Sequence, residues 1–228
     1  MAGIYIIFIF FSLVSWLISS RLKSKFREYS AINLPGNMSG QEIAENMLRD
    51  NGIYDVKIVS TPGELSDHYN PLTKTVNLSH EVFYGRHISA AAVAAHECGH
   101  AVQHAEAYAW LTMRSRLVPI VSFSSNIVQW VLLAGILTIQ VFPALLFIGI
   151  IMFALTTLFS FITLPVEFDA SNRALKWLNN KGILSGSYLE KASNALNWAA
   201  STYVVAALSS LATLMYYVMI YLGGKRND

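Results

Sequence analysis

The sequence has few charged residues, and they are unevenly distributed. Only 13% of its 228 residues are Lys, Arg, Asp or Glu, whereas an ordinary soluble domain has about 25%. Hydrophobic residues make up 54%, and the mean hydropathy is +0.43. No charged side chain occurs in residues 1–20, 117–166 or 192–224. This composition argues against a purely soluble protein and indicates a membrane protein.

Other features are missing as well. A net charge of +2 without a Lys/Arg cluster argues against binding to nucleic acid. The single cysteine, Cys98, excludes an internal disulfide, so the fold does not depend on an oxidising compartment. The first segment has neither a basic leader region nor a small-residue cleavage site, and basic residues from Arg21 to Arg27 follow it. We therefore interpret it as a retained signal anchor.

The three charge-free segments predict four transmembrane helices. One crossing needs about 20 apolar residues, so the segments hold one, two and one crossings. Residues 117–166 would be about 75 Å long as one helix, against about 30 Å of hydrocarbon, and must fold back as a hairpin. Its best turn is Gln140 to Pro143. The predicted spans are residues 3–19, 118–139, 144–164 and 199–222.

The distribution of Lys and Arg predicts the orientation in the membrane. If all four segments cross, residues 21–116 and 165–198 share one face, which holds every Lys and Arg except Lys225 and Arg226. The positive-inside rule places that face in the cytoplasm. We expect a multi-pass protein of the cell membrane. The C-terminal Lys225 and Arg226 conflict with this orientation, so whether the last segment crosses fully stays open.

The main chemical motif is His96-Glu97-Cys98-Gly99-His100, in an Ala-rich helix predicted from Ile88 to about Trp110. Residues four apart share a helix face, so His96 and His100 can bind one zinc ion, with Glu97 beside it as general base. Zinc lowers the pKa of a bound water and polarises a carbonyl. This is the zincin arrangement. We expect Cys98 to be a buried small hydrophobe and Gly99 to permit close packing.

A catalytic zinc needs a third protein ligand and one open position. His104 lies about 12 Å along the helix from His96, too far to share its ion, and is expected to support the site or contact substrate. Glu167 is the stronger candidate, because the hairpin returns it to the face that carries His96. Asp169 lies two residues further on, and we expect it to support the ligands.

Elsewhere, Ser39 to Glu42 predicts the start of a helix that ends near residues 51–52, and residues 56–59 and 74–79 predict strands.

The expected fold is a mainly α integral membrane protein with a small α+β zincin-like cytosolic domain and a short sheet. We predict one unit: residues 1–20 the anchor, 21–116 the zincin-like domain, 117–166 the hairpin, 167–198 a helix with the third ligand, and 199–222 the last span.

Several motifs together resemble a known family, the YugP-like neutral zinc metallopeptidases of bacterial membranes. The motifs are Ser66 to Pro71, Val76 to Ser79, Ala94 to His104 and Pro165 to Ser171. The resemblance covers almost the whole chain, and a more distant one extends to the HtpX and CAAX prenyl proteases. In those proteases a Glu-x-x-x-Asp helix supplies the third ligand.

The resemblance implies roles for further residues. Glu167 takes the ligand role, but Ser171 stands where the family has Asp, so the hydrogen bond of that carboxylate does not carry over; Asp169 or Asn172 could replace it. An upstream edge strand would bind substrate as an added strand, which points to Val76, Asn77 and Leu78. Candidates for the oxyanion donor are His68, Tyr69 and Arg173.

These observations favour a membrane-anchored zinc endopeptidase with one zinc per chain, acting on peptides or proteins, including membrane or misfolded ones. An intramembrane site-two-type protease would place the motif in a spanning helix. A third hypothesis is a non-catalytic membrane scaffold or adaptor with structural zinc. That closed site would need a fourth ligand from His68, His80 or His104. The sequence does not predict the oligomeric state.

Overall fold

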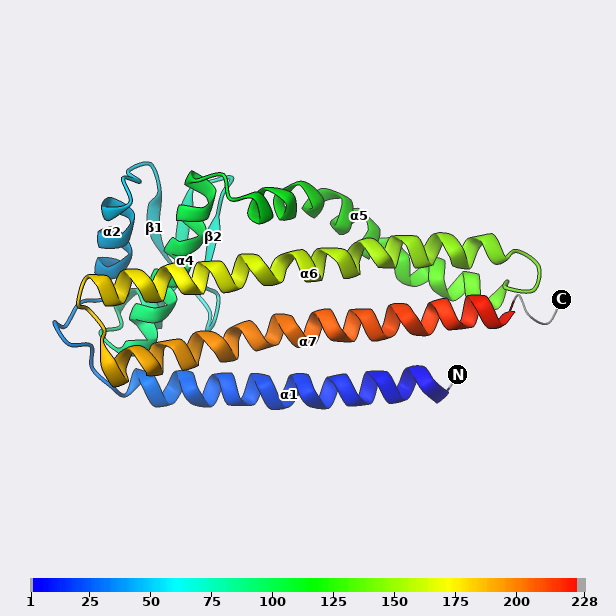
Figure 1. Ribbon diagram of the computed structural model, residues 1–228, viewed down its shortest axis with the longest axis horizontal. Helices are drawn as coiled ribbons and strands as arrows, with labels where there is room; N and C mark the ends of the chain where they lie inside the picture. Colours follow the sequence, from blue (N-terminus) through cyan, green and yellow to red (C-terminus); the bar gives the residue numbers. More distant parts are fainter. Residues whose placement is uncertain (1, 225–228) are drawn as a thin grey trace. The chain divides into compact units, whose positions relative to one another are not determined.

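The computed structural model describes residues 2–224 and is mostly helical (Figure 1). Lys225 and Arg226 lie outside the described residues. The helices are α1 (Ala2–Ser30), α2 (Gly40–Asp50), α3 (His80–Tyr84), α4 (Ile88–Ala105), α5 (Ala109–Leu137), α6 (Pro143–Asn180) and α7 (Gly186–Gly224). The strands are β1 (Lys57–Thr61), β2 (His68–Asn70) and β3 (Thr75–Ser79).

The chain forms two compact units. The first, which we call the apolar unit, comprises residues 1–17, 113–164 and 202–228; the second, the site unit, comprises residues 18–112 and 165–201. Helices α1, α5, α6 and α7 contribute residues to both units. All three strands belong to the site unit.

In the apolar unit, α5 and α6 form the predicted hairpin, joined by a turn at residues 138–142. Val128 and Leu132 of α5 pack with Leu146 and Ile150 of α6 in one buried cluster. The two helices approach closely at Gly135, where a Cβ atom would lie 2.6 Å from the Cα atom of Leu146. Residues 117–166 therefore fold back at a turn that overlaps the predicted one, with Pro143 already in α6.

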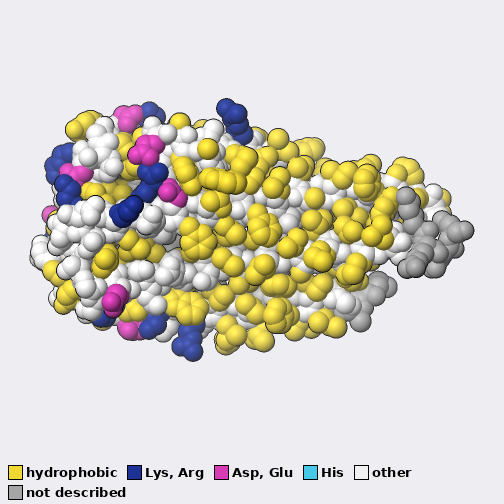
Figure 2. Space-filling model, in the orientation of Figure 1, with side chains coloured by type: hydrophobic (Ala, Val, Ile, Leu, Met, Phe, Trp, Pro, Cys, Tyr) yellow, Lys and Arg dark blue, Asp and Glu magenta, His cyan; other side chains and the backbone are white. Residues whose placement is uncertain are grey.

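Within residues 2–224, four helices are long and apolar enough to cross a membrane: Gly3–Ser30, Ala109–Leu137, Pro143–Asn180 and Gly186–Gly223. Hydrophobic side chains cover the visible surface of the apolar unit, whereas most charged side chains lie over the site unit (Figure 2). Large side chains are widely exposed in these helices, such as Phe8 at 69% and Trp130 at 70%. Surfaces of this kind are normal in contact with lipid but rare on soluble monomers.

Several of these helices are longer than the spans predicted from sequence. α6 continues through Pro165 to Asn180 instead of restarting at residue 167, and α7 begins at Gly186 instead of residue 199. A proline within a helix removes one backbone donor, and here the helix continues on both sides of it. Glu167 therefore lies on the same continuous helix as the second half of the hairpin.

The sheet of the site unit corrects one sequence expectation. The strand order is β1-β3-β2, with β3 parallel to β1 and antiparallel to β2. Val76, Asn77 and Leu78 thus lie in the central strand, whose backbone groups pair with strands on both sides, and the prediction of an edge strand there is wrong. The sequence does not predict β2, because its three residues lie next to the turn-forming pair Asn70-Pro71.

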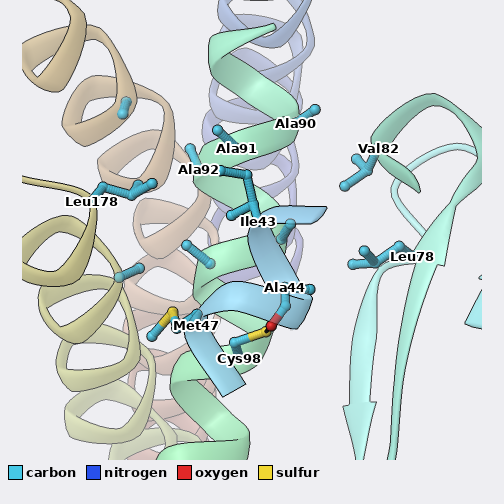
Figure 3. Packing of buried hydrophobic residues seen from close by; sticks show 14 of the residues in the cluster. Ile43, Ala44, Met47, Leu78, Val82, Ala90, Ala91, Ala92, Cys98 and Leu178 are labelled. Carbon is cyan, nitrogen blue, oxygen red and sulfur yellow. Dashed lines mark hydrogen bonds between the residues drawn. The ribbon is translucent and has the colours of Figure 1, made fainter. Parts of the chain in front are cut away.

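Helix α2 packs against α4 in the main hydrophobic cluster of the site unit. Ser39 and Glu42 form a capping box at the predicted start of α2, and Asn51 caps its end. On α4, the buried Cys98 lies with its Sγ atom 3.7 Å from the Ala44 carbonyl oxygen of α2 (Figure 3). The expectation that Cys98 is a small buried side chain is confirmed.

Helix α4 begins after His87, whose side chain accepts a hydrogen bond from the Ala90 backbone amide. It ends at Ala105, short of the predicted Trp110, because the chain turns at residues 106–108 before α5 begins. Ala107 in this turn has a φ of 50°, a left-handed conformation that interrupts a helix. The motif residues 96–100 lie in the second half of α4.

Candidate metal centre

The site forms where α4 passes α6 at very short range. A Cβ atom on Gly99 would lie 2.6 Å from the Ala170 carbonyl oxygen and 3.1 Å from its Cα atom. Both obstacles are backbone atoms, which cannot rotate away. Gly99 therefore permits the close approach expected from the sequence, and it brings the motif within reach of Glu167.

The three predicted ligands converge at this crossing. The Nε2 atoms of His96 and His100 lie 3.4 Å and 3.5 Å from Oε2 of Glu167. One ligand atom from each of the three residues lies within 4.8 Å of the other two. Glu167 is only 4% exposed and His100 only 8%. The cluster is therefore a shielded pocket of two nitrogen atoms and one carboxylate.

This arrangement fits a zinc ion. Zinc takes His nitrogen and carboxylate oxygen at about 2.0–2.2 Å, so two ligands of a tetrahedral site lie roughly 3.4 Å apart. The observed separations between histidine and carboxylate agree with that value. Within residues 2–224 no fourth His, Cys, Asp or Glu joins the group. The cluster can therefore hold one metal ion and leave one position open.

The carboxylate also changes the acid–base behaviour of His100. Burial alone lowers the pKa of this imidazole, but the hydrogen bond to Glu167 and the negative charges of Glu167 and Glu97 raise it more. The net result is a pKa above the usual value. Without metal, His100 therefore tends to hold a proton between itself and Glu167.

Each histidine ligand has a hydrogen-bond partner on its other ring nitrogen. Nδ1 of His96 lies 3.1 Å from Oγ of Ser171, and Nδ1 of His100 lies 3.0 Å from Oε1 of Gln103. The expectation for Ser171 needs correction, because this hydroxyl reaches His96 itself without a carboxylate. Sequence reasoning gave Gln103 no role, since the sequence does not show which face of α4 meets α6.

Asp169 reaches the candidate ligands only through Gln103, and it also pairs with Arg173. Gln103 donates from Nε2 to Oδ2 of Asp169 at 2.8 Å, and Nε of Arg173 lies 2.5 Å from the same oxygen. Arg173 also pairs with Glu106 at 2.6 Å and lies over the Tyr108 ring at 5.7 Å. The guanidinium proposed as an oxyanion donor is thus engaged in an ion-pair network.

The remaining candidate residues lie outside the ligand cluster. His68 is exposed on β2 with Nδ1 2.8 Å from the Ser66 carbonyl oxygen. The hydroxyl of Tyr69, also on β2, lies 2.8 Å from Nδ1 of His104 at the end of α4. His104 thus links the end of α4 to β2.

The half-buried carboxylate of Asp67 lies close enough to Glu97 to be affected by its negative charge. Asp67, just before β2, accepts hydrogen bonds from the backbone and hydroxyl of Ser79. Burial raises the pKa of Asp67, the bonds from Ser79 lower it, and the charge of Glu97 raises it further. Asp67 lies in the motif Ser66 to Pro71, which resembles the metallopeptidase family, but the sequence predicts no role for it.

The fold and the cluster together define a mostly helical protein with four helices long enough to cross a membrane and one His-His-Glu site able to hold a metal. The chain belongs to the family described as "putative neutral zinc metallopeptidase", whose model matches residues 4–222. It is 42% identical to "Putative membrane protease YugP" of Bacillus subtilis (strain 168) over 205 residues, 90% of each chain. No solved structure matches it.

Proposed function

We propose that this protein is a membrane-anchored zinc endopeptidase that hydrolyses peptide bonds in protein substrates. The observation that carries the proposal is the convergence of His96, His100 and Glu167 within 4.8 Å, with Glu97 on the same helix. Membership of a zinc metallopeptidase family and the membrane protease name of a relative support it.

In this proposal each residue has one task. His96, His100 and Glu167 would hold the ion, which would lower the pKa of a bound water and polarise the scissile carbonyl. Glu97, only 8% exposed, accepts the proton of the attacking water and delivers it to the leaving amine. The free position of a three-ligand site leaves room for water and substrate.

The proposal that the protein is anchored in a membrane is supported by the four long apolar helices and by the positions of the basic residues. The basic residues of the site unit favour the cytoplasmic side for this unit. α4, which carries the motif, is not among the four candidate spans. This placement disfavours the site-two-type alternative, in which the motif helix crosses the bilayer.

The corrected sheet order offers a different strand for substrate. β2 pairs with β3 on one side, and no other described strand pairs with its second edge. Tyr69 of β2 contacts His104 at the end of the motif helix, so β2 lies beside α4. We propose that an extended peptide pairs with the free edge of β2, which gives affinity with little sequence selectivity.

The test uses purified full-length protein in detergent. We expect about one zinc per chain, which His100→Ala loses, and cleavage of casein that Glu97→Gln abolishes while zinc remains. Glu45→Gln, on the exposed face of α2, serves as the matched control and should leave both unchanged. Wild-type protein without metal after gentle purification would overturn the proposal.

The alternative is a scaffold with structural zinc. A closed structural site has four protein ligands, usually including cysteine. The only cysteine, Cys98, instead directs its Sγ atom to the Ala44 carbonyl oxygen of α2. X-ray absorption separates the two functions, because the peptidase requires three protein ligands and one water. Four protein ligands without any cleavage would favour the scaffold.

A further inference from the structure

Gln103 is a fully buried amide between α4 and α6, with 0% of its surface exposed. Its Oε1 atom faces Nδ1 of His100, and its Nε2 atom lies 2.8 Å from both the Val166 carbonyl oxygen and Oδ2 of Asp169. One side chain thus contacts a histidine ligand and two acceptors on the helix that supplies Glu167. Burying an amide requires such partners.

These partners fix the orientation of the amide. A backbone carbonyl has no hydrogen to donate, and the Asp169 carboxylate is paired with Arg173. The NH₂ group must therefore face these two oxygens, and Oε1 must face His100. An amide oxygen only accepts, so the hydrogen of His100 lies on Nδ1, and Nε2 is free to bind metal once its proton is lost.

The second histidine ligand has an equally uncharged partner. Nδ1 of His96 contacts the Ser171 hydroxyl, whereas Nδ1 of His100 contacts Gln103, and the Asp169 carboxylate lies one hydrogen bond further away behind that amide. A carboxylate in direct contact would make a histidine ligand more basic and bind the metal more tightly. Uncharged partners orient the rings and leave more positive charge on the metal.

We propose that Gln103 is a positioning residue of the metal site, which holds the ring of His100 and selects its metal-binding tautomer. The proposal rests on the zinc site proposed above. Gln103 touches neither substrate nor the ion; it acts through His100 and through the spacing of α4 and α6.

The main test is Gln103→Met, which keeps the size of the side chain and removes its hydrogen bonds. We expect zinc affinity, measured by competition with a chromophoric chelator, to fall about 10–100-fold, as for other partners of metal ligands. The control is Gln41→Met, which removes an amide bonded to Glu45 on the surface of α2 and should bind zinc like wild type. A variant Gln103→Met that binds zinc like this control would overturn the proposal.

A double variant separates positioning from packing. Gln103→Glu combined with Asp169→Asn exchanges the amide and the carboxylate, so that an acceptor still faces His100 and an acceptor still faces Arg173. We expect zinc affinity at least tenfold better than that of Gln103→Met. If the two bind equally weakly, the amide serves only packing and the proposal fails.

The remaining outcomes are also decisive. If Gln103→Met does not fold, the double variant is compared with wild type: affinity within about tenfold supports positioning, and a larger loss overturns it. Failure of the zinc site itself gives a different result, because wild type would then bind no zinc or would keep it in His100→Ala. Both are measured by zinc binding alone, without an activity assay.

Discussion

At the scale of single residues, protons and zinc compete for the same nitrogen atoms. His100 and Glu167 face each other at 3.5 Å, and the negative carboxylate favours the protonated imidazole. Metal binding releases such protons, so the affinity of the site depends on pH. The site is therefore able to exist as a buried ion pair or as a metal complex.

This competition predicts the direction of the pH dependence. Because the pKa of His100 is raised, the proton remains at pH values where a free imidazole, with a pKa of about 6.5, has lost it. We expect zinc affinity to fall as the pH falls, beginning above pH 6.5 and approaching tenfold per unit of pH. Chelator competition between about pH 8 and pH 6 measures it. A constant affinity over this range would contradict the raised pKa.

A second prediction at this scale concerns Ser171. Replacing Ser171 with Ala removes the hydrogen bond to Nδ1 of His96, which leaves the ring free to rotate. We expect zinc affinity to fall about tenfold, at the low end for such partners, because the bond is a neutral one at 3.1 Å. Ser30→Ala, at the end of α1, is the control. Equal zinc affinities of the two variants would show that Ser171 is dispensable.

The sequence predicts site residues whose role follows from a single helix, but not those whose role depends on how two helices pack together. His96, Glu97 and His100 follow from the periodicity of an Ala-rich helix, and Glu167 from a hairpin that must return. Gln103 and Ser171 acquire their roles only from the face on which α4 meets α6. The sequence predicts close packing at Gly99 but does not show that α6 is the helix that packs there.

At the scale of elements, the crossing of α4 and α6 decides where the ligands lie. Its closest approach is at Gly99, between His96 and His100, so any change of spacing acts directly on the ligand atoms. Gln103 and the Arg173–Glu106 pair hold the same two helices together further along.

Gly99→Ala tests this crossing. The added methyl group would meet the Ala170 backbone at 2.6 Å, so α6 must move and carry Glu167 away from the histidines. We expect a loss of zinc binding and a lower melting temperature, by calorimetry with and without chelator. Gly223→Ala in α7 has nothing within 4 Å and is the control. Unchanged zinc binding in Gly99→Ala would mean that the crossing does not set the site.

The sequence predicts helix ends and turns that depend on neighbouring residues, but it does not predict a strand that forms only by pairing with another strand. The cap at Ser39 and the turn around Gln140 carry their own chemistry, and both were predicted correctly. β2 has only three residues and exists through its partner β3. Because the sequence does not reveal β2, it predicts an edge strand at residues 76–78, which lie in the central strand of the sheet.

At the scale of the whole molecule, the distribution of charge predicts a topology. The loop between α5 and α6 and the loop before β2 lie on opposite sides of the membrane if the four helices cross it. Gln140 and Glu64 are exposed in these two loops. The positive-inside rule places Gln140 outside and Glu64 in the cytoplasm.

Two single cysteine variants test this topology. An impermeant maleimide should label Gln140→Cys in intact cells, and Glu64→Cys only after permeabilisation. This pattern follows from the basic residues of the site unit, which resist translocation. Labelling of Glu64→Cys in intact cells would reverse the orientation and place the site outside.

The burial of Cys98 makes such experiments simple. Its side chain is 0% exposed, and burial raises the pKa of its thiol, so hardly any reactive thiolate forms at neutral pH. The natural sequence therefore already serves as a background without reactive cysteine. Probes and crosslinkers can be attached at any chosen position while the sulfur between the two histidine ligands stays untouched.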